Sequence, residues 1–144
     1  MKEIVKRLCR KYDTHDPFEL ADCLGVILVK SPLTDNVRGF YRFIQRRKVI
    51  VVNSNLTWEE QRIVCAHELG HAVLHKDVNA VFLNMCTFLV TDRYELEANH
   101  FAADLLISDE DVELYKELSV QHLQIMFGFD EETIRYRFGG RKDL

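Results

Sequence analysis

The chain has 144 residues, of which 47% are hydrophobic and 29% are charged, a composition that suits one globular domain over residues 1–144. A formal net charge of −4 offers no basic face for nucleic acid, and no run approaches the roughly 18 apolar residues of a membrane span. The four cysteines have neither a CxxC pair nor a disulfide spacing, so we predict reduced thiols and a cytoplasmic protein.

Residues 1–54 predict two short helices followed by three strands. Residues 2–12 are amphipathic, with charges throughout and without the continuous apolar core of a secretory signal. Pro17 suits a first helical position and Gly25 a helix stop, so a second helix is expected between them. The run VILVK then predicts a strand, and RGFYRFIQ and KVIVVNSN predict a hairpin around the polar RRK.

A capping box opens the first long helix. Thr57 can accept a hydrogen bond from the backbone of Glu60, whose side chain can reach back, and we expect this helix to run to about Lys76. The apolar residues 78–90 that follow fit a strand, a buried loop or a helix, and their role stays open.

The remaining residues predict further helices. A second long helix is expected from Arg93 to Ile107, a third begins at Ser108, and two short helices meet at Gly128. We assign about residues 110–144 to a helical C-terminal subregion. Helices, a small antiparallel sheet and then more helices predict an α+β fold.

The segment AHELGHAVLH gives the first long helix its chemistry. On a helix, His67 and His71 lie about 40° apart and one turn along the axis, so their imidazoles can hold one ion. Glu68 lies about 100° from His67 and about 60° from His71, where its carboxylate can take a proton from water beside the ion. Gly70 removes a side chain where another element can approach closely. This is the HExxH arrangement of a zincin-like active-site helix.

A third histidine, His75, does not fit the metal site. It lies eight residues after His67, or roughly 12 Å along the helix axis, which is too far for both to bind one ion. It also misses the HExxHxxGxxH spacing of a third ligand beyond a glycine turn. We therefore predict that His75 is a residue of the rim or the surface.

The third ligand is expected in RYELEANHFAADLL, because a catalytic zinc usually has three protein ligands and an open position. Glu95 and Asn99 lie about 40° apart on one helix face, bordered by the small Ala98 and Ala102, which allow close packing on the HExxH helix. Glu97 points about 200° away from Glu95 and is expected to be a solvated or salt-bridged charge. We therefore choose Glu95 as the ligand and Asn99 as a hydrogen-bond acceptor for a ligand imidazole.

The two segments AHELGHAVLH and ELEANHFAADLLIS, in this order, resemble the ImmA/IrrE family of zinc metallopeptidases. Upstream, GFY and IVVNSNLTWEEQRIVCAHELGH extend the resemblance to about residues 16–110. It implies that His67, His71 and Glu95 bind one Zn²⁺. It also implies that Glu68 is the general base. The family often has a proline soon after the FAA-LL run, which ISDED lacks, and this affects only the local turn.

The implied reaction is the hydrolysis of a peptide bond by a zinc-dependent metallo-endopeptidase. Such sites usually have a further donor for the oxyanion, and the candidates are Tyr41, Tyr94 and His100. The strand KVIVVN is a candidate to align an extended substrate against a sheet edge, and the alternative is a plain core strand.

The resemblance also implies a substrate. Proteins of this family cut helix-turn-helix repressors of mobile elements, prophages or stress regulons, which derepresses transcription. We expect the same substrate class here, with an accessory protein or a pulse of metal as candidate activators. Two alternatives stay open: a repressor-binding module that holds zinc without cutting, and a regulatory peptidase with another cytosolic target. Glu68 favours catalysis, because a structural zinc site needs no base.

The C-terminal run VQHLQIMFGFDEETIRYRF has the helix-glycine-helix order of a DNA-reading motif. Its second helix begins with DEET, which places negative charge where phosphates and base edges would lie. We therefore expect no direct binding of nucleic acid, and a helical hairpin that packs on the core or contacts the substrate.

Overall fold

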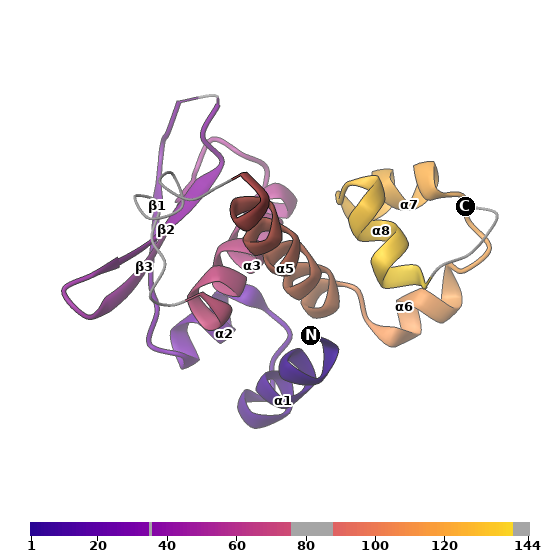
Figure 1. Cartoon of the computed structure of the whole chain (residues 1–144), viewed down its shortest axis with the longest axis horizontal. Helices are drawn as coiled ribbons and strands as arrows, with labels where there is room; N and C mark the ends of the chain where they lie inside the picture. Colours follow the sequence, from indigo (N-terminus) through magenta and orange to yellow (C-terminus); the bar gives the residue numbers. More distant parts are fainter. Residues whose placement is uncertain (35, 76–87, 140–144) are drawn as a thin grey trace.

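The computed structural model describes residues 1–34, 36–75 and 88–139 and confirms the α+β class (Figure 1). A sheet lies at one end of the molecule, two long helices lie in the middle, and short C-terminal helices form the other end (Figure 1). The helices are α1 (Lys2–Tyr12), α2 (Pro17–Cys23), α3 (Trp58–Leu74), α5 (Phe88–Leu106), α6 (Asp109–Leu114), α7 (Val120–Phe127) and α8 (Glu131–Phe138). The strands are β1 (Ile27–Ser31), β2 (Gly39–Ile44) and β3 (Arg47–Asn53).

The sheet is mixed, although the sequence predicted an antiparallel one. Its strand order is β1-β3-β2, with β1 parallel and β2 antiparallel to β3. The predicted hairpin is present, and its turn lies at Gln45 and Arg46, whose φ angles of 51° and 63° suit a two-residue type I′ loop. An alternating apolar pattern tells which face of a strand is buried but not which strand is its neighbour. The sequence pattern therefore could not predict that β1 pairs with β3 in parallel.

Both long helices are found, with different agreement at their starts. At the start of α3 the Thr57 hydroxyl accepts a hydrogen bond from the N–H of Glu60 at 3.2 Å, which is one half of the predicted capping box. The carboxylate of Glu60 lies 3.9 Å from Arg38. The second long helix, α5, begins at Phe88, earlier than the predicted Arg93. Most of the apolar segment 78–90 lies outside the described residues.

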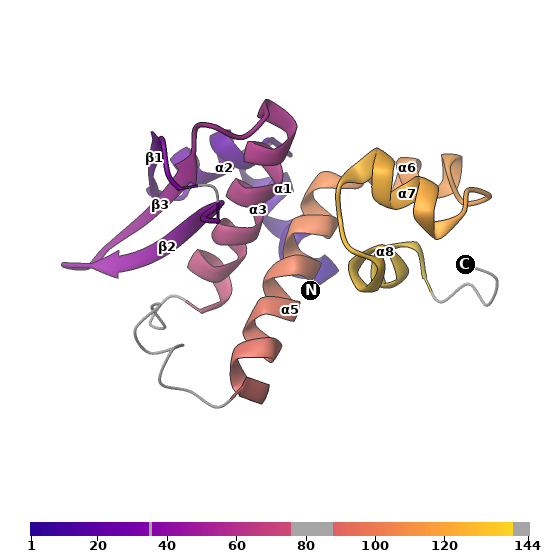
Figure 2. The ribbon, with the colours of Figure 1, turned by 90° about the horizontal axis from the view of Figure 1, so that it is seen from above.

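Helices α3 and α5 lie side by side and approach each other closely (Figure 2). A Cβ added to Gly70 would lie 3.1 Å from the Cβ of Phe101 and 3.2 Å from the Cα of Ala98. Ala98 and Ala102 are completely buried. The small residues on the facing surfaces therefore allow the close approach, as the sequence predicted.

One hydrophobic cluster joins the sheet to the helices. Ile50 of β3, Leu69 of α3 and Phe101 of α5 are completely buried in it, and Leu123 of α7 and Ile134 of α8 extend it into the C-terminal helices. Among the described residues, no helix combines the length and the apolar character needed to cross a membrane.

A buried arginine fixes α8 to the end of α5. Arg137 donates to the carbonyl oxygen of Ile107 from Nε at 2.9 Å and from a second nitrogen at 2.6 Å, and to Asp109 at 2.9 Å. Its Nε also lies 3.5 Å from the buried carboxylate of Asp104, which accepts a hydrogen bond from the Tyr136 hydroxyl at 2.7 Å. Burial raises the pKa of Asp104, while Tyr136 and Arg137 oppose that shift.

Gly70→Ala is expected to lower the free energy of unfolding by about 1 kcal/mol, because overpacking costs about 1–3 kcal/mol and the better helix propensity of alanine returns up to about 1 kcal/mol. The new Cβ would press on the backbone of Ala98, which has no rotamer to change. Urea unfolding followed by far-UV circular dichroism measures the difference. A variant at least as stable as wild type would mean that α3 and α5 can move slightly apart without lowering the free energy of unfolding.

Arg137→Met is expected to lower the free energy of unfolding by about 3 kcal/mol, because it leaves the carboxylate of Asp104 buried without its cation. The double variant Arg137→Met/Asp104→Asn should recover part of that loss, since the remaining buried group is then neutral. Urea unfolding curves of the wild type and both variants give the comparison. Equal stabilities of the single and double variants would show that Asp104 does not depend on the arginine.

Candidate metal centre

The close packing of α3 and α5 brings three side chains to one point. Nε2 of His67 lies 3.0 Å from one carboxylate oxygen of Glu95, and Nε2 of His71 lies 2.9 Å from the other. The three ligand atoms all lie within 4.8 Å of one another, so a single ion can contact all of them. Two imidazoles and one carboxylate are a donor set of catalytic zinc sites, and the half-exposed side chain of Glu95 leaves one side open.

The three groups stabilise one another electrostatically. Burial works against ionisation of Glu95, but hydrogen bonds from His67 and His71 outweigh it and hold the pKa of Glu95 well below its usual range. Burial likewise lowers the pKa of His67, but the hydrogen bond with Glu95 and the charges of Glu68 and Glu95 raise it above its ordinary value. The point between the three side chains therefore favours positive charge, which suits a divalent cation.

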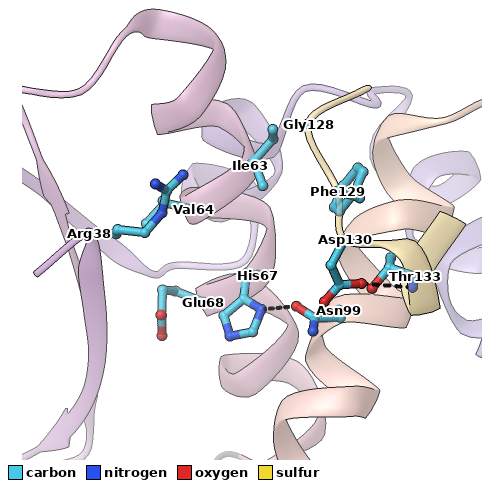
Figure 3. A pocket seen from close by; sticks show the side chains of 10 residues that line it. All are labelled: Arg38, Ile63, Val64, His67, Glu68, Asn99, Gly128, Phe129, Asp130 and Thr133. Atoms are coloured by element: carbon cyan, nitrogen blue, oxygen red, sulfur yellow. Dashed lines mark hydrogen bonds between the residues drawn. The ribbon is translucent and has the colours of Figure 1, made fainter. Parts of the chain in front are cut away.

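Asn99 lies beside one of the two imidazoles. Its Oδ1 is 2.8 Å from Nδ1 of His67 (Figure 3). Because an amide oxygen only accepts, the Nδ1–H of His67 donates to it, and Nε2 is left to face Glu95. This is the arrangement that fixes the tautomer of a metal-binding histidine.

Glu68 is not one of the three converging groups, and it lines a cavity together with His67 (Figure 3). Burial raises the pKa of Glu68, and the charge of Glu95 adds to this, while His67 and His71 oppose it. A carboxylate with a raised pKa is a stronger base than an exposed one. The geometry thus separates a group suited to proton transfer from the groups suited to holding an ion.

The cavity beside Glu68 has a volume of about 420 Å³. Its walls come from the residue directly before β2, from α3, from α5, from the junction of α7 and α8 and from α8 itself (Figure 3). The lining residues are Arg38, Ile63, Val64, His67, Glu68, Asn99, Gly128, Phe129, Asp130 and Thr133. The sequence predicted that the C-terminal hairpin packs on the core or contacts the substrate, but it singled out neither Phe129 nor Asp130, because only the fold brings them to the HExxH helix.

The prediction that His75 is a rim or surface residue is wrong. Its side chain is only 4% exposed, its Nδ1 lies 3.0 Å from Nδ1 of His71, and its Nε2 lies 2.7 Å from Oε2 of Glu97. Glu97 is the salt-bridged charge that the sequence predicted, since Arg93 also contacts it at 3.1 Å. The sequence signal for His75 was its position one turn after His71, whereas the prediction had compared it only with His67.

The three candidates for an oxyanion donor occupy other places. Tyr41 is buried in the hydrophobic core, and the ring of Tyr94 lies 4.5 Å from that of His75. His100 stacks on Tyr136 of α8 with ring centroids 3.6 Å apart. Within the described part of the chain, the lining of the cavity beside Glu68 includes none of the three. Their role in catalysis stays a prediction.

Comparison with known proteins gives both a family and relatives. Residues 21–139 match the family described as the IrrE N-terminal-like domain. "Uncharacterized immunity region protein 2" of Bacillus phage phi105 is 41% identical over 134 residues, which are 92% of this chain and 85% of that protein. "Metallopeptidase ImmA" of Bacillus subtilis (strain 168) is 25% identical over 138 residues, which are 96% of this chain and 77% of that protein.

A solved structure shares the fold. The "Mycobacterium tuberculosis transcriptional regulator" superposes with a TM-score of 0.62 at 18% sequence identity. The match covers 99% of this chain, which spans about half, 48%, of the length of that protein. At this identity the likeness concerns the fold alone.

Glu95→Ala is expected to abolish the binding of one Zn²⁺ per chain, because it removes one of three ligands. Glu97→Ala keeps all three ligands, so it should still bind one ion per chain at saturating Zn²⁺. Isothermal titration with Zn²⁺ gives both stoichiometries. Loss of binding in Glu97→Ala with retention in Glu95→Ala would show that the wrong glutamate was chosen.

Proposed function

The chain belongs to the ImmA/IrrE family of metallopeptidases, and on that premise we propose that it is a zinc-dependent metallo-endopeptidase. The observation that carries the proposal is the convergence of His67, His71 and Glu95 to within 4.8 Å, from helices far apart in the sequence. Glu68 adjoins this point and opens to a cavity. A site that only stabilised the fold would need neither the base nor the cavity.

In this proposal His67, His71 and Glu95 hold one Zn²⁺. Bound there, the ion supplies Lewis acidity, which polarises a carbonyl group and makes water a better nucleophile. The hydrogen bonds that hold the two imidazoles keep their Nε2 atoms turned toward Glu95. The chain thus offers the ligand atoms already in place.

Glu68 moves the proton of the reaction. It accepts a proton from the water that attacks the peptide carbonyl carbon, and it passes that proton to the nitrogen that leaves as an amine. One water is consumed, and one carboxyl and one amino terminus are formed. Burial of Glu68, which raises its pKa, makes it the stronger base that the first transfer needs.

The cavity beside Glu68 is suited to a side chain of the substrate next to the bond that is cut. Ile63, Val64 and Phe129 give it apolar walls, while Arg38 and Asp130 bring opposite charges to its lining. The volume of about 420 Å³ has room for a large side chain. We therefore expect peptides with a large apolar residue at this position to be preferred.

The strand that the sequence suggested for aligning an extended substrate does not lie at an edge of the sheet. The candidate KVIVVN forms β3, which is paired with β1 on one side and with β2 on the other, so it is the core strand of the alternative interpretation. Among the strands that the structure describes, β1 and β2 lie at the two edges of the sheet, and Arg38 directly before β2 lines the cavity. We propose that a substrate segment adds to β2 as a further strand.

The proposed substrate is a helix-turn-helix repressor of a mobile element or prophage, cut at one site in the cytoplasm. This is supported by the name of the phage phi105 relative, an immunity region protein. A peptidase acting among cytoplasmic proteins must be selective, so little activity on casein-like proteins is expected. An activating partner or a pulse of metal remains part of the proposal.

Glu68→Gln is expected to abolish cleavage, because the amide cannot accept the proton of the attacking water. Quantitative N-terminal proteomics of the host, expressing either wild type or Glu68→Gln, should show one new N-terminus inside a repressor with wild type alone. Glu59→Gln is the matched control, since it makes the same change at an exposed position of the same helix and should cleave normally.

Identical N-termini with wild type and Glu68→Gln would contradict the peptidase proposal. If a repressor also co-purified with both, the protein would be the alternative, a repressor-binding module that holds zinc without cutting. A wild-type cleavage site in a protein other than a repressor would retain the peptidase and replace the substrate.

A further inference from the structure

A line of polar contacts leads from the metal centre to the surface along the ends of α3 and α5. Nδ1 of His71 lies 3.0 Å from Nδ1 of His75, and Nε2 of His75 lies 2.7 Å from Oε2 of Glu97. The other oxygen of Glu97 accepts a hydrogen bond from Nε of Arg93 at 3.1 Å. The two histidines are buried, Glu97 is partly exposed, and Arg93 is in solvent.

The positions of the protons along this line follow from what each group can donate. An ionised carboxylate only accepts, so Nε2 of His75 must carry a hydrogen that it donates to Glu97. A neutral His75 then has a lone pair on Nδ1, and this lone pair faces Nδ1 of His71. The contact of 3.0 Å is therefore a hydrogen bond in which His71 donates from Nδ1.

That assignment decides what the other nitrogen of His71 can do. Without an ion, Nε2 of His71 donates a hydrogen bond to Glu95 at 2.9 Å. To bind an ion, Nε2 must instead offer a lone pair, and the one hydrogen that His71 keeps must then lie on Nδ1. If His75 carried its hydrogen on Nδ1 instead, two hydrogens would point at each other unless that of His71 moved to Nε2. The ligand nitrogen would then be blocked.

We propose that His75 and Glu97 are positioning residues of the metal centre, in which Glu97 fixes the tautomer of His75 and His75 in turn fixes that of His71. The proposal rests on the metal site proposed above. The tautomer of His67 is fixed directly by Asn99, which accepts a hydrogen bond from its Nδ1. Each ligand imidazole thus has its own acceptor, one a single amide and the other a two-residue relay.

The surroundings of His75 hold its ring in this arrangement. The ring of Tyr94 lies against it at 4.5 Å with an interplanar angle of 59°. Arg93 restrains the carboxylate of Glu97 from the solvent side. A histidine that only filled space would need no partner at both nitrogens, whereas His75 has one at each.

The test compares four proteins: wild type, Glu97→Ala, His75→Phe and the control Asp92→Asn. His75→Phe keeps a ring of similar size beside Tyr94 but removes the acceptor for His71. Asp92→Asn removes a negative charge from an exposed position of α5, the helix that also carries Glu97. Circular dichroism and urea unfolding establish that each variant is folded. If His75→Phe does not fold, the partly exposed Glu97 still gives the answer.

Two measurements are made on these proteins. Zn²⁺ affinity is measured by competition with a chelating dye, and Glu97→Ala and His75→Phe are expected to bind about 10–100-fold more weakly than wild type. Asp92→Asn should bind as wild type does. Long-range ¹H–¹⁵N correlation spectra of the zinc-loaded wild type should show hydrogen on Nδ1 of His71 and on Nε2 of His75, and in Glu97→Ala the His75 pattern should change.

The outcomes separate this proposal from the proposed function. A wild type that binds no Zn²⁺ would overturn both. A wild type that binds Zn²⁺, with Glu97→Ala and His75→Phe equal to it in affinity, would overturn only the relay. Hydrogen on Nδ1 of His75 in the zinc-loaded wild type would also overturn it. A merely structural role would lower the unfolding free energy and leave the tautomers and the affinity unchanged.

Discussion

The candidate metal centre depends on how closely α3 and α5 approach each other. Gly70 meets the backbone of Ala98 at a distance that leaves no room for a side chain, and His67 and His71 lie on the two sides of that glycine in the sequence. The contact therefore sets the distance from the histidines to Glu95, whose two oxygens reach one imidazole each at about 3 Å. A wider spacing would leave the carboxylate unable to bridge both.

Close packing of this kind buries polar groups, which costs desolvation free energy. Hydrogen bonds between these groups offset that cost. Among the described residues, no buried side-chain nitrogen or oxygen lacks a hydrogen-bond partner. Glu95 contacts both His67 and His71, Asn99 contacts His67, and His75 contacts His71. These contacts lower the cost of desolvation and orient the ligand atoms in one step, so the folding of the helix pair also builds the site.

The C-terminal helices contribute shape to a site whose reactive groups lie elsewhere. Arg137 ties α8 to the end of α5, and this holds Phe129 and Asp130 opposite Glu68. The junction passes close to α3, because a Cβ on Gly128 would lie 2.6 Å from Cδ1 of Ile63, and its φ of 79° also favours glycine. The C-terminal helices thereby shape the cavity, while the carboxylate of Glu68 comes from α3.

Sequence alone determined the relations between side chains that lie within one or two turns of the same helix. The cap at Thr57 followed from the residue types at the start of the helix. The common face of His67 and His71, and the position of Glu95 on the face of Asn99 and away from Glu97, followed from the helical angle of about 100° per residue. The structure places these side chains where that geometry puts them. Short-range periodicity constrains such relations directly, because backbone hydrogen bonding fixes the angle between neighbouring side chains on a helix.

Only the tertiary structure decided the contacts between distant segments. The parallel pairing of β1 with β3, the burial of His75 against Glu97, and the wall that Phe129 and Asp130 add to the cavity are of this kind. A repeating pattern states which face of an element is buried but not what covers it. That choice is made by the packing of the whole chain, where small residues such as Gly70 let one helix approach another.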